Sequence, residues 1–359
     1  MDMEDRERRK QDRGERRKEA ESQRRRIIEQ EKKRRRQVVR KQRAILGGAA
    51  VLLLLFIWGG VSVWMGRKSS EEQRKDEAAL ETAAKEQEKA ERREKKQHAE
   101  EEMESAMTSL ESTVEDLISD YDGNWSVYVE ELEYENDFSI NNQGMYPASL
   151  VKIYTMAATF ANMEQVIKNE TDYLGSEESA KATVAQLLEN MIEISDNESY
   201  NELVRLQSSD RDFGEGCGYI NAYLQEEGYT GTGVHTTLHP AASSMENDGL
   251  GDNVTCVEDC GKLLEKIYKG SCGSQEDSGE MLHLLLNQEN TLKIPEGLPE
   301  GIEVAHKTGE TSEVQHDVGI IYGESTDFIL CIMVDELTSS ADVYTQYHEL
   351  TETVYDALN

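Results

Sequence analysis

The chain is short of different residue types in different places, and each shortage limits what that segment can form. Residues 1–43 have almost no apolar side chain before Ile27, so they cannot build a hydrophobic core. Residues 44–66 contain no charged residue, and only 10 of the 39 lysines and arginines follow residue 99. That last part holds 53 of the 72 acidic residues, so the net charge of −33 averages a basic N-terminal tail and an acidic remainder. The composition therefore favours one large folded unit after the first third of the chain.

The uncharged run Ala44–Gly66 predicts a transmembrane helix. It matches the ~20 apolar residues that cross a ~30 Å hydrocarbon core, and it is more extended than the apolar part of a cleaved signal peptide. A buried core helix is the alternative. Residues 24–43 carry 11 basic side chains and residues 67–86 carry 5, which predicts a single-pass protein with a cytoplasmic N-terminus. Everything after Gly66 is then expected outside the membrane.

Two highly charged segments flank this run. Residues 1–43 alternate Arg and Lys with Glu and Gln, which is typical of a disordered or loosely helical cytoplasmic tail. Contact with anionic lipid headgroups explains its charge, so we expect no nucleic-acid partner, although a nucleic-acid-binding arm is the alternative. Residues 67–104 have too few apolar positions for a coiled-coil seam and predict a solvated helical stalk.

The remaining residues, 105–359, predict an α+β domain. Helical spacing of apolar residues begins near Met107 and stops at Asp120–Gly123. Strands are expected at both ends of the domain, namely at Trp125–Glu131, Asp137–Ile140, Glu303–Lys307, Val318–Tyr322 and Phe328–Val334. Helices are expected between them at Ser149–Gln165, Thr183–Ile194, Glu198–Leu206, Gly218–Glu226 and Val257–Tyr268. A last amphipathic helix, Ala341–Leu358, should have an apolar face of Tyr344, Tyr347, Leu350, Val354 and Tyr355. This order indicates a mostly antiparallel sheet backed by terminal helices, with an inserted helical lobe.

All five cysteines lie after Gly66, where disulfides are permitted, and their odd number leaves at least one unpaired. Cys331 lies in an apolar run and is expected to be a buried strand thiol. Pairing among the others stays open: Cys217, Cys256, Cys260 and Cys272. Two pairs are spaced by four residues, His235 with His239 and Cys256 with Cys260, a spacing that can bind zinc on one helix face. Core, disulfide and loop roles explain the same residues, so we expect no metal.

Three short motifs occur in the order Ser149-Leu150-Val151-Lys152, Ser195-Asp196-Asn197 and Lys307-Thr308-Gly309. Each alone is weak evidence, because a surface Ser and Lys on an ordinary helix, or a helix cap, explains it equally well. Their joint occurrence in this order is far less probable by chance.

The spacing within the first motif has a chemical reason. Ser149 at a helix start and Lys152 one turn later share a face, which places the amine within hydrogen-bond reach of the hydroxyl. Burial and a second cation, Lys307, would lower the pKa of Lys152 and allow it to take the proton of the serine.

These motifs resemble those of class A β-lactamases and penicillin-binding proteins. The resemblance covers Met107–Asn359 and includes His316–Gly319, which looks like the family's next strand. It implies the antiparallel sheet with an inserted all-α lobe, and a serine hydrolase that works through an acyl-enzyme without a cofactor. Ser149 is then the nucleophile and Lys152 its activator.

The resemblance also assigns the other motif residues. Ser195 should relay a proton to the departing nitrogen, Asn197 should hold the amide of the substrate, and Asp196 should brace the loop. Lys307 and Thr308 should bind a substrate carboxylate, and Gly309 should let the substrate approach the backbone. The backbone N–H groups of Ser149 and Glu310 should form the oxyanion hole.

One expected residue is missing. Class A β-lactamases carry a glutamate, with an asparagine four residues on, that activates the deacylating water. The matching stretch here, Thr236–Ala241, has His239 at the expected place, and the nearest acid, Glu246, is followed four residues later by Leu250. We therefore expect Ser149 to be acylated by β-lactams or D-alanyl-D-alanine-like amides of peptidoglycan peptides, with slow β-lactam hydrolysis. The alternatives are a cell-wall D,D-carboxypeptidase or transpeptidase, and a non-catalytic sensory module.

Overall fold

The computed structural model describes residues 70–239, 245–338 and 342–359. The predicted basic tail and apolar run lie outside these residues. Within the described ranges, none of the helices combines the length and the apolar character that crossing a membrane requires. The chain divides after Arg92 into two compact units, and the second unit, Arg93–Asn359, contains the sheet and the three motifs.

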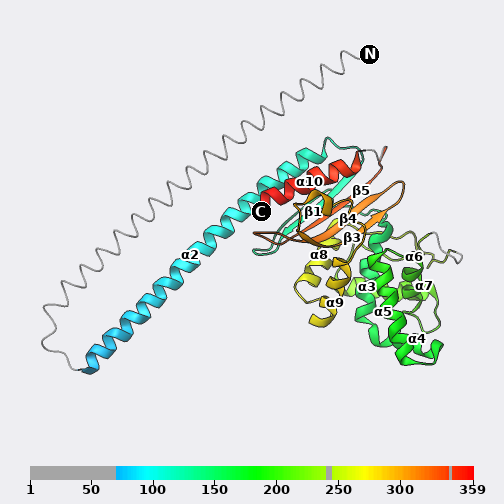
Figure 1. The fold of residues 1–359 in the computed structure, drawn as a ribbon, viewed down its shortest axis with the longest axis horizontal. Coiled ribbons are helices and arrows are strands. Elements are labelled where there is room, and N and C mark those ends of the chain that lie inside the picture. Colours follow the sequence, from blue (N-terminus) through cyan, green and yellow to red (C-terminus); the bar gives the residue numbers. More distant parts are fainter. Residues whose placement is uncertain (1–69, 240–244, 339–341) are drawn as a thin grey trace, which may run out of the picture. The chain divides into compact units, whose positions relative to one another are not determined.

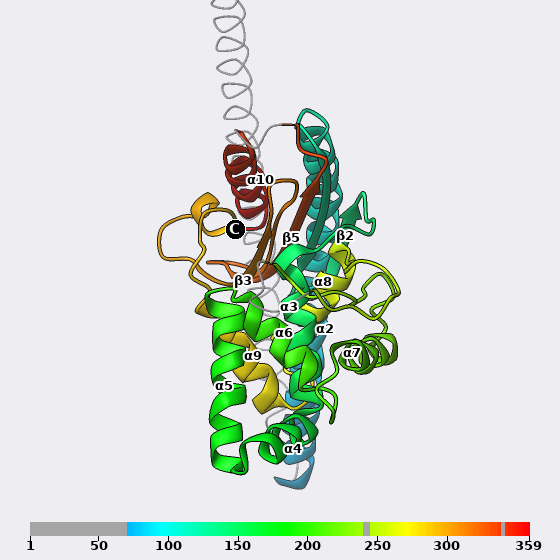
Figure 2. The same ribbon diagram turned by 90° about the vertical axis from the view of Figure 1, so that its right-hand side faces the viewer.

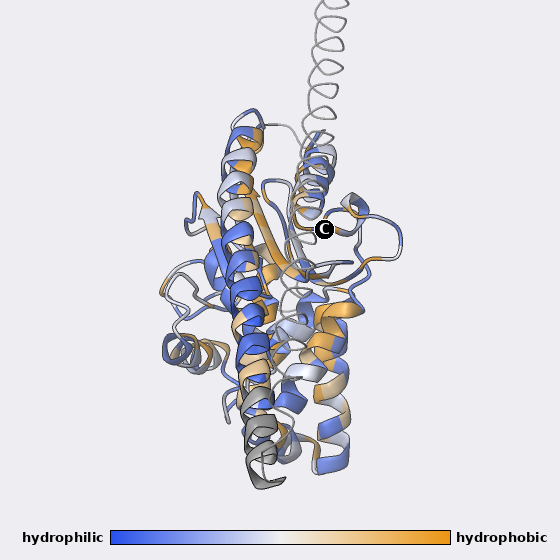
Figure 3. Ribbon diagram, turned by 90° about the vertical axis from the view of Figure 1, so that its left-hand side faces the viewer, coloured by the Kyte–Doolittle hydropathy of each residue, from blue (hydrophilic) through white to orange (hydrophobic). Residues whose placement is uncertain are grey.

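Helix α2, Ser70–Ile118, joins the predicted stalk and the first domain helix in one element. Residues 81–98 of this helix are exposed, as their charged composition predicts, whereas Met107, Leu110, Val114 and Ile118 are buried. Figure 3 shows that the coloured part of α2 is mostly hydrophilic. The burial of α2 therefore changes near the predicted boundary at residue 104, but the helix continues through this boundary without a break.

A five-stranded antiparallel sheet forms the centre of the domain, in the order β2-β1-β5-β4-β3. The strands are β1 Asn124–Glu131, β2 Asn136–Ile140, β3 Glu303–Glu310, β4 Gln315–Tyr322 and β5 Phe328–Asp335. β1 lies beside β5, with Val127 opposite Ile332, so the two ends of the domain meet in the middle of the sheet (Figure 1). β3 is longer than predicted because it continues through Thr308 and Gly309, and β4 starts earlier than predicted because Gln315 pairs with Glu310.

Helices cover both faces of the sheet (Figure 1, Figure 2). One face is covered by the last turns of α2 and by the whole of α10, Val343–Leu358. There the Tyr347 hydroxyl donates to the carbonyl oxygens of Gln315 and Ile332 at 2.9 and 3.1 Å. α8, Val257–Tyr268, and α9, Gln275–Leu286, cover the other face together with the helical lobe. Tyr344 was expected on the apolar face of α10, and this expectation was wrong, because its side chain is exposed.

The helices between β2 and β3 differ from the sequence prediction in several places, and α5 and α7 begin at Glu177 and Phe213 instead of Thr183 and Gly218. The predicted helix Ser149–Gln165 is three elements, the 3₁₀ turn η1 Ala148–Leu150, α3 Val151–Ala161 and α4 Met163–Leu174, because Asn162 leaves the helical conformation. The other lobe helices are α5 Glu177–Glu193, α6 Asn197–Arg205 and α7 Phe213–Glu227. Helix α9 was not predicted, although Ser274 and Asp277 form a capping box at its start.

The predicted fold class is confirmed: an α+β domain with an antiparallel sheet flanked by helices and an inserted α-helical lobe. All five cysteines are free and buried, with Cys331 in β5 as expected. The thiols therefore belong to the hydrophobic core and form no disulfide.

Candidate active site

The first motif lies where η1 leads into α3. Ala148, directly before the serine, has a φ of 46°, a left-handed conformation that non-glycine residues adopt rarely. Lys152 Nζ lies 2.9 Å from Ser149 Oγ, which confirms that the two groups share one helix face. The amine is thus placed for direct proton exchange with the hydroxyl.

The second motif joins α5 to α6 and brings a second hydroxyl to the same place. Ser195 has a φ of 58°, and its Oγ accepts from Lys152 Nζ at 3.1 Å and from Lys307 Nζ at 2.9 Å. The next residue, Asp196, caps α6 by accepting from the Ser199 N–H at 2.8 Å, as expected of a residue that braces the loop. The strained backbone at Ser195 therefore keeps its hydroxyl between two lysines.

The two lysines have pKa values far below that of a lysine in water. Burial and, to a smaller extent, the positive charge of Lys307 lower the pKa of Lys152 to about 6, against the opposing effect of Asp196. Lys152 Nζ lies 2.7 Å from the Ser195 carbonyl oxygen and 2.7 Å from Asn197 Oδ1. Burial lowers the pKa of Lys307 to about 7, although the negative charge of Asp317 acts to raise it. Near pH 7 Lys152 is therefore mostly the neutral amine that can accept a proton.

Gly309 has a packing role in the structure. A Cβ at this position would lie 2.6 Å from the Pro147 carbonyl oxygen and 3.0 Å from the Leu150 amide nitrogen. Only glycine therefore lets β3 approach the turn that carries Ser149. The resemblance assigned this glycine to substrate approach, whereas the atoms that a side chain would meet belong to the protein itself.

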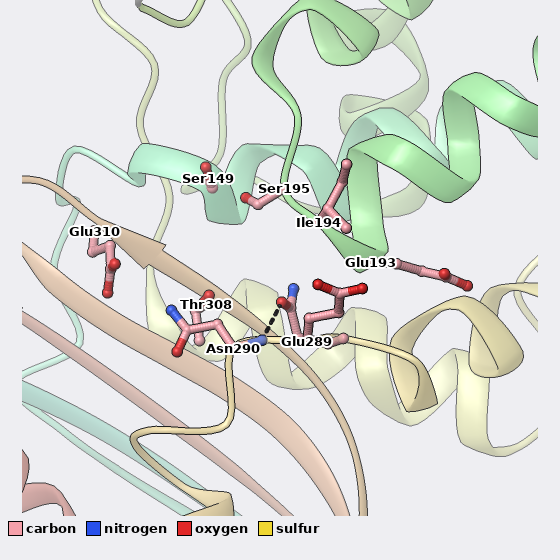
Figure 4. Close-up of a pocket in the computed structure, with 9 residues that line it drawn as sticks. Ser149, Glu193, Ile194, Ser195, Glu289, Asn290, Thr308 and Glu310 are labelled. Atoms are coloured by element: carbon pink, nitrogen blue, oxygen red, sulfur yellow. Dashed lines mark hydrogen bonds between the residues drawn. The ribbon is translucent and has the colours of Figure 1, made fainter.

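A cavity of about 340 Å³ opens over Ser149 (Figure 4). The residues that line it are Ser149, Glu193, Ile194, Ser195, Gln288, Glu289, Asn290, Thr308 and Glu310. Four of the predicted site residues, Ser149, Ser195, Thr308 and Glu310, are in this lining. Lys152 and Lys307 reach the two serines from buried positions, and Asn197 contacts Lys152. The structure thus brings all three motifs to one place.

Sequence reasoning missed part of this site. Lys293 is fully buried and its Nζ lies 2.7 Å from Glu310 Oε2, while Glu193 and Glu289 line the cavity. A signal for Lys293 was available, because cations are scarce in this acidic domain: it is one of only 10 lysines and arginines after residue 99.

In the loop where the deacylating glutamate was sought, the residues that the structure describes contribute no carboxylate to the cavity lining. The His239 carbonyl accepts from Asn197 Nδ2 at 2.7 Å, which places the backbone of this residue beside the site while its side chain is exposed. The Glu246 carboxylate pairs with Arg205 at 2.6 Å instead of entering the cavity. His235 pairs with Asp248 at 2.7 Å, and the described part of the chain contains no cluster of three or more His, Cys, Asp or Glu side chains that could hold a metal ion.

Comparisons with known proteins agree with the fold described above. Residues 109–358 match a family described as the Beta-lactamase enzyme family, and no curated protein matches the chain. The extended-spectrum β-lactamase TLA-1 is 19% identical, with 70% of this chain and 99% of that chain covered and a TM-score of 0.57. A class A β-lactamase from Bacteroides cellulosilyticus is 18% identical, with 71% and 98% covered and a TM-score of 0.57. A mutant of PBP-A, solved as an acyl-enzyme complex with penicillin G, is 22% identical, with 70% and 96% covered and a TM-score of 0.55.

Proposed function

Because the chain belongs to the beta-lactamase enzyme family, we propose that it is a serine hydrolase whose Ser149 is acylated by β-lactams or by D-alanyl-D-alanine-like amides. The observation that carries this proposal is the 2.9 Å approach of Lys152 Nζ to Ser149 Oγ at the cavity wall. The pKa of Lys152, lowered to about 6 by burial, makes the amine a base at neutral pH.

The proposed acylation uses each of the converging groups. Ser149 Oγ attacks the carbonyl carbon of the amide and gives its proton to the neutral amine of Lys152. The carbonyl oxygen becomes an oxyanion, which the N–H groups of Ser149 and Glu310 stabilise. When the carbon–nitrogen bond breaks, Ser195 gives its proton to the leaving nitrogen and regains one from Lys152, whose Nζ lies 3.1 Å away. The products are the Ser149 ester and a free amine, with Lys152 neutral again.

A second candidate function is a cell-wall D,D-carboxypeptidase or transpeptidase. One observation favours it: Glu246, the nearest acid after the second motif, pairs with Arg205. An enzyme without a base for the deacylating water retains its acyl group longer, which suits transfer to another amine as well as slow hydrolysis. Both candidates share the acylation of Ser149.

Replacing Ser149 by alanine is expected to abolish the covalent adduct formed with benzylpenicillin. Intact-mass measurement should show one added penicillin on the wild-type domain, and peptide mapping should place it on Pro147–Lys152. The control is Ser112→Ala, which removes an exposed hydroxyl on α2 and should leave the adduct unchanged. An adduct that persists in Ser149→Ala would show that another residue is the nucleophile.

We also propose that the domain is held outside the cell membrane by one transmembrane helix at residues 44–66, with residues 1–43 in the cytoplasm. The support is the uncharged run and the excess of basic residues before it. Protease added to intact cells should release a soluble fragment that begins within residues 67–104. Cleavage within residues 1–43 with protection of the domain would reverse the orientation.

A further inference from the structure

His316, near the start of β4, is a histidine that the proposed mechanism does not use. Its side chain is fully buried and is not among the residues that line the cavity. The sequence marked this position only as part of the strand that follows the third motif. Each of the two ring nitrogens nevertheless has a hydrogen-bond partner, so the ring joins two parts of the fold.

The partners of the two nitrogens fix the protonation of the ring. Nδ1 accepts from the Val334 N–H of β5 at 3.1 Å, and Nε2 lies 2.9 Å from the carbonyl oxygen of Tyr146. Because a backbone N–H donates and a carbonyl oxygen accepts, the proton of the neutral ring is on Nε2. Burial lowers the pKa of His316 to about 4, although the bond to the Tyr146 carbonyl acts to raise it. At neutral pH the ring therefore carries no charge and donates to Tyr146.

Tyr146 lies three residues before Ser149, in the segment that leads to the nucleophile. Met145 pairs through both of its backbone groups with the segment before α8, at 2.8 and 3.0 Å, and His316 holds the next carbonyl. Ala148 then has a φ of 46°, a conformation that persists only when the surrounding structure holds it. The chain is thus fixed at two successive residues before it enters the strained turn.

The edge of the sheet contacts the same turn at a second point. Gly309 of β3 is the partner of His316 in the ladder, and a Cβ on Gly309 would lie 2.6 Å from the Pro147 carbonyl oxygen. Paired residues of β3 and β4 therefore meet consecutive residues of the turn. The close approach at Gly309 sets the distance between turn and sheet, whereas the hydrogen bond from His316 sets the orientation of the turn.

We propose that His316 is a positioning residue for Ser149: its ring holds the Tyr146 carbonyl and so keeps the strained turn in the conformation that places Ser149 Oγ 2.9 Å from Lys152 Nζ. This inference rests on the proposed function, in which that distance permits proton transfer. A turn that relaxes also moves the Ser149 N–H, which belongs to the proposed oxyanion hole. A displacement of about 1 Å in such a geometry costs on the order of 10²-fold in rate.

Two substitutions separate the two hydrogen bonds of the ring. His316→Asn supplies an acceptor near the place of Nδ1 for the Val334 N–H, but its side chain is too short to donate to Tyr146. His316→Gln supplies an N–H donor near the place of Nε2 for Tyr146 and gives up the bond from Val334. His316→Asn should lower the limiting rate constant for acylation of Ser149 by benzylpenicillin at least about tenfold, and His316→Gln should stay within about threefold of wild type.

Acylation is followed by intact mass over a range of benzylpenicillin concentrations, which separates the limiting rate constant from the half-saturating concentration. The positioning role predicts a loss in the rate constant alone, because His316 does not line the cavity. Rate constants are taken from the molecules that become acylated, so that misfolded protein does not contribute, and the Tm of each variant is recorded. The control is His283→Asn, the same change at an exposed position of α9, which should alter neither value.

The outcomes separate this inference from the proposed function. If both variants lower the Tm and still acylate at the wild-type rate, or if His316→Gln is as slow as His316→Asn, the positioning role is refuted while the serine hydrolase stands. If His316→Asn does not fold, His316→Gln decides alone, since a loss of more than about tenfold with the Tyr146 donor retained refutes the role. If wild-type protein forms no adduct on Ser149, the proposed function fails and this inference fails with it.

Discussion

Lys152→Ala is expected to slow acylation of Ser149 by about 10²–10⁴-fold, the usual contribution of a general base. The Lys152 amine lies 2.9 Å from Ser149 Oγ. Its hydrogen-bond partners described above include no carboxylate that could act as the base once the amine is removed. The rate of labelling by a fluorescent penicillin measures this step directly. Lys152→Arg should be as slow, because a guanidinium keeps the positive charge but cannot act as a base at neutral pH.

The pH profile of the wild-type protein tests the same role. Only the neutral amine accepts the proton, and the fraction of neutral amine rises with pH through the lowered pKa of Lys152, about 6. The acylation rate should therefore increase about tenfold per pH unit below that value and level off above it. Lys168→Ala, at an exposed position on α4, is the control and should retain both rate and profile. A flat profile between pH 4.5 and 7 would contradict the assignment of Lys152 as base.

Turnover is expected to be limited by deacylation. A chromogenic cephalosporin should give a burst close to one equivalent per enzyme, followed by steady-state hydrolysis slowed by about 10²–10⁴-fold relative to an enzyme with a loop base. The physical reason is that Glu246 pairs with Arg205 and the side chain of His239 is exposed. Rapid linear hydrolysis without a burst would show that another group activates the water.

One substitution tests whether a carboxylate from this loop can supply the missing step. Because Asn197 Nδ2 donates to the His239 carbonyl at 2.7 Å, a carboxylate at this position starts next to the site, and His239→Glu should raise the steady-state rate while leaving the burst in place. Glu246→Gln should change neither phase. If Glu246→Gln instead removes the steady-state rate, Glu246 is the base and the protein is an efficient β-lactamase.

The sequence predicted most elements of the domain because their signals are local. β1, β2 and α8 were predicted to within one residue, since alternation and helical spacing of apolar residues need no tertiary information. The break at Asn162 and the start of α9 were missed because each is marked by a single residue or cap, which a periodic pattern does not register.

The site residues were likewise predictable only where a local spacing or a motif marked them. Ser149 and Lys152 are three residues apart, so helix geometry alone places their side chains together. Ser195 and Lys307 joined them through a resemblance between motifs. Lys293, in a turn, and Glu310, at the end of β3, are 17 residues apart and had neither a local pattern nor a motif to connect them.

By itself the sequence determined the α+β class, the order of most elements and the three motifs proposed to react, because these depend on residue type and on spacing along the chain. Only the tertiary structure decided the chemistry of those groups. Desolvation lowers the pKa of Lys152 and of Lys307, and desolvation exists only once α3, the Ser195 turn and β3 have closed around the amines. Folding also brings Glu193, Glu289 and Glu310 to the lining of the cavity over Ser149 and pairs Glu310 with the buried Lys293.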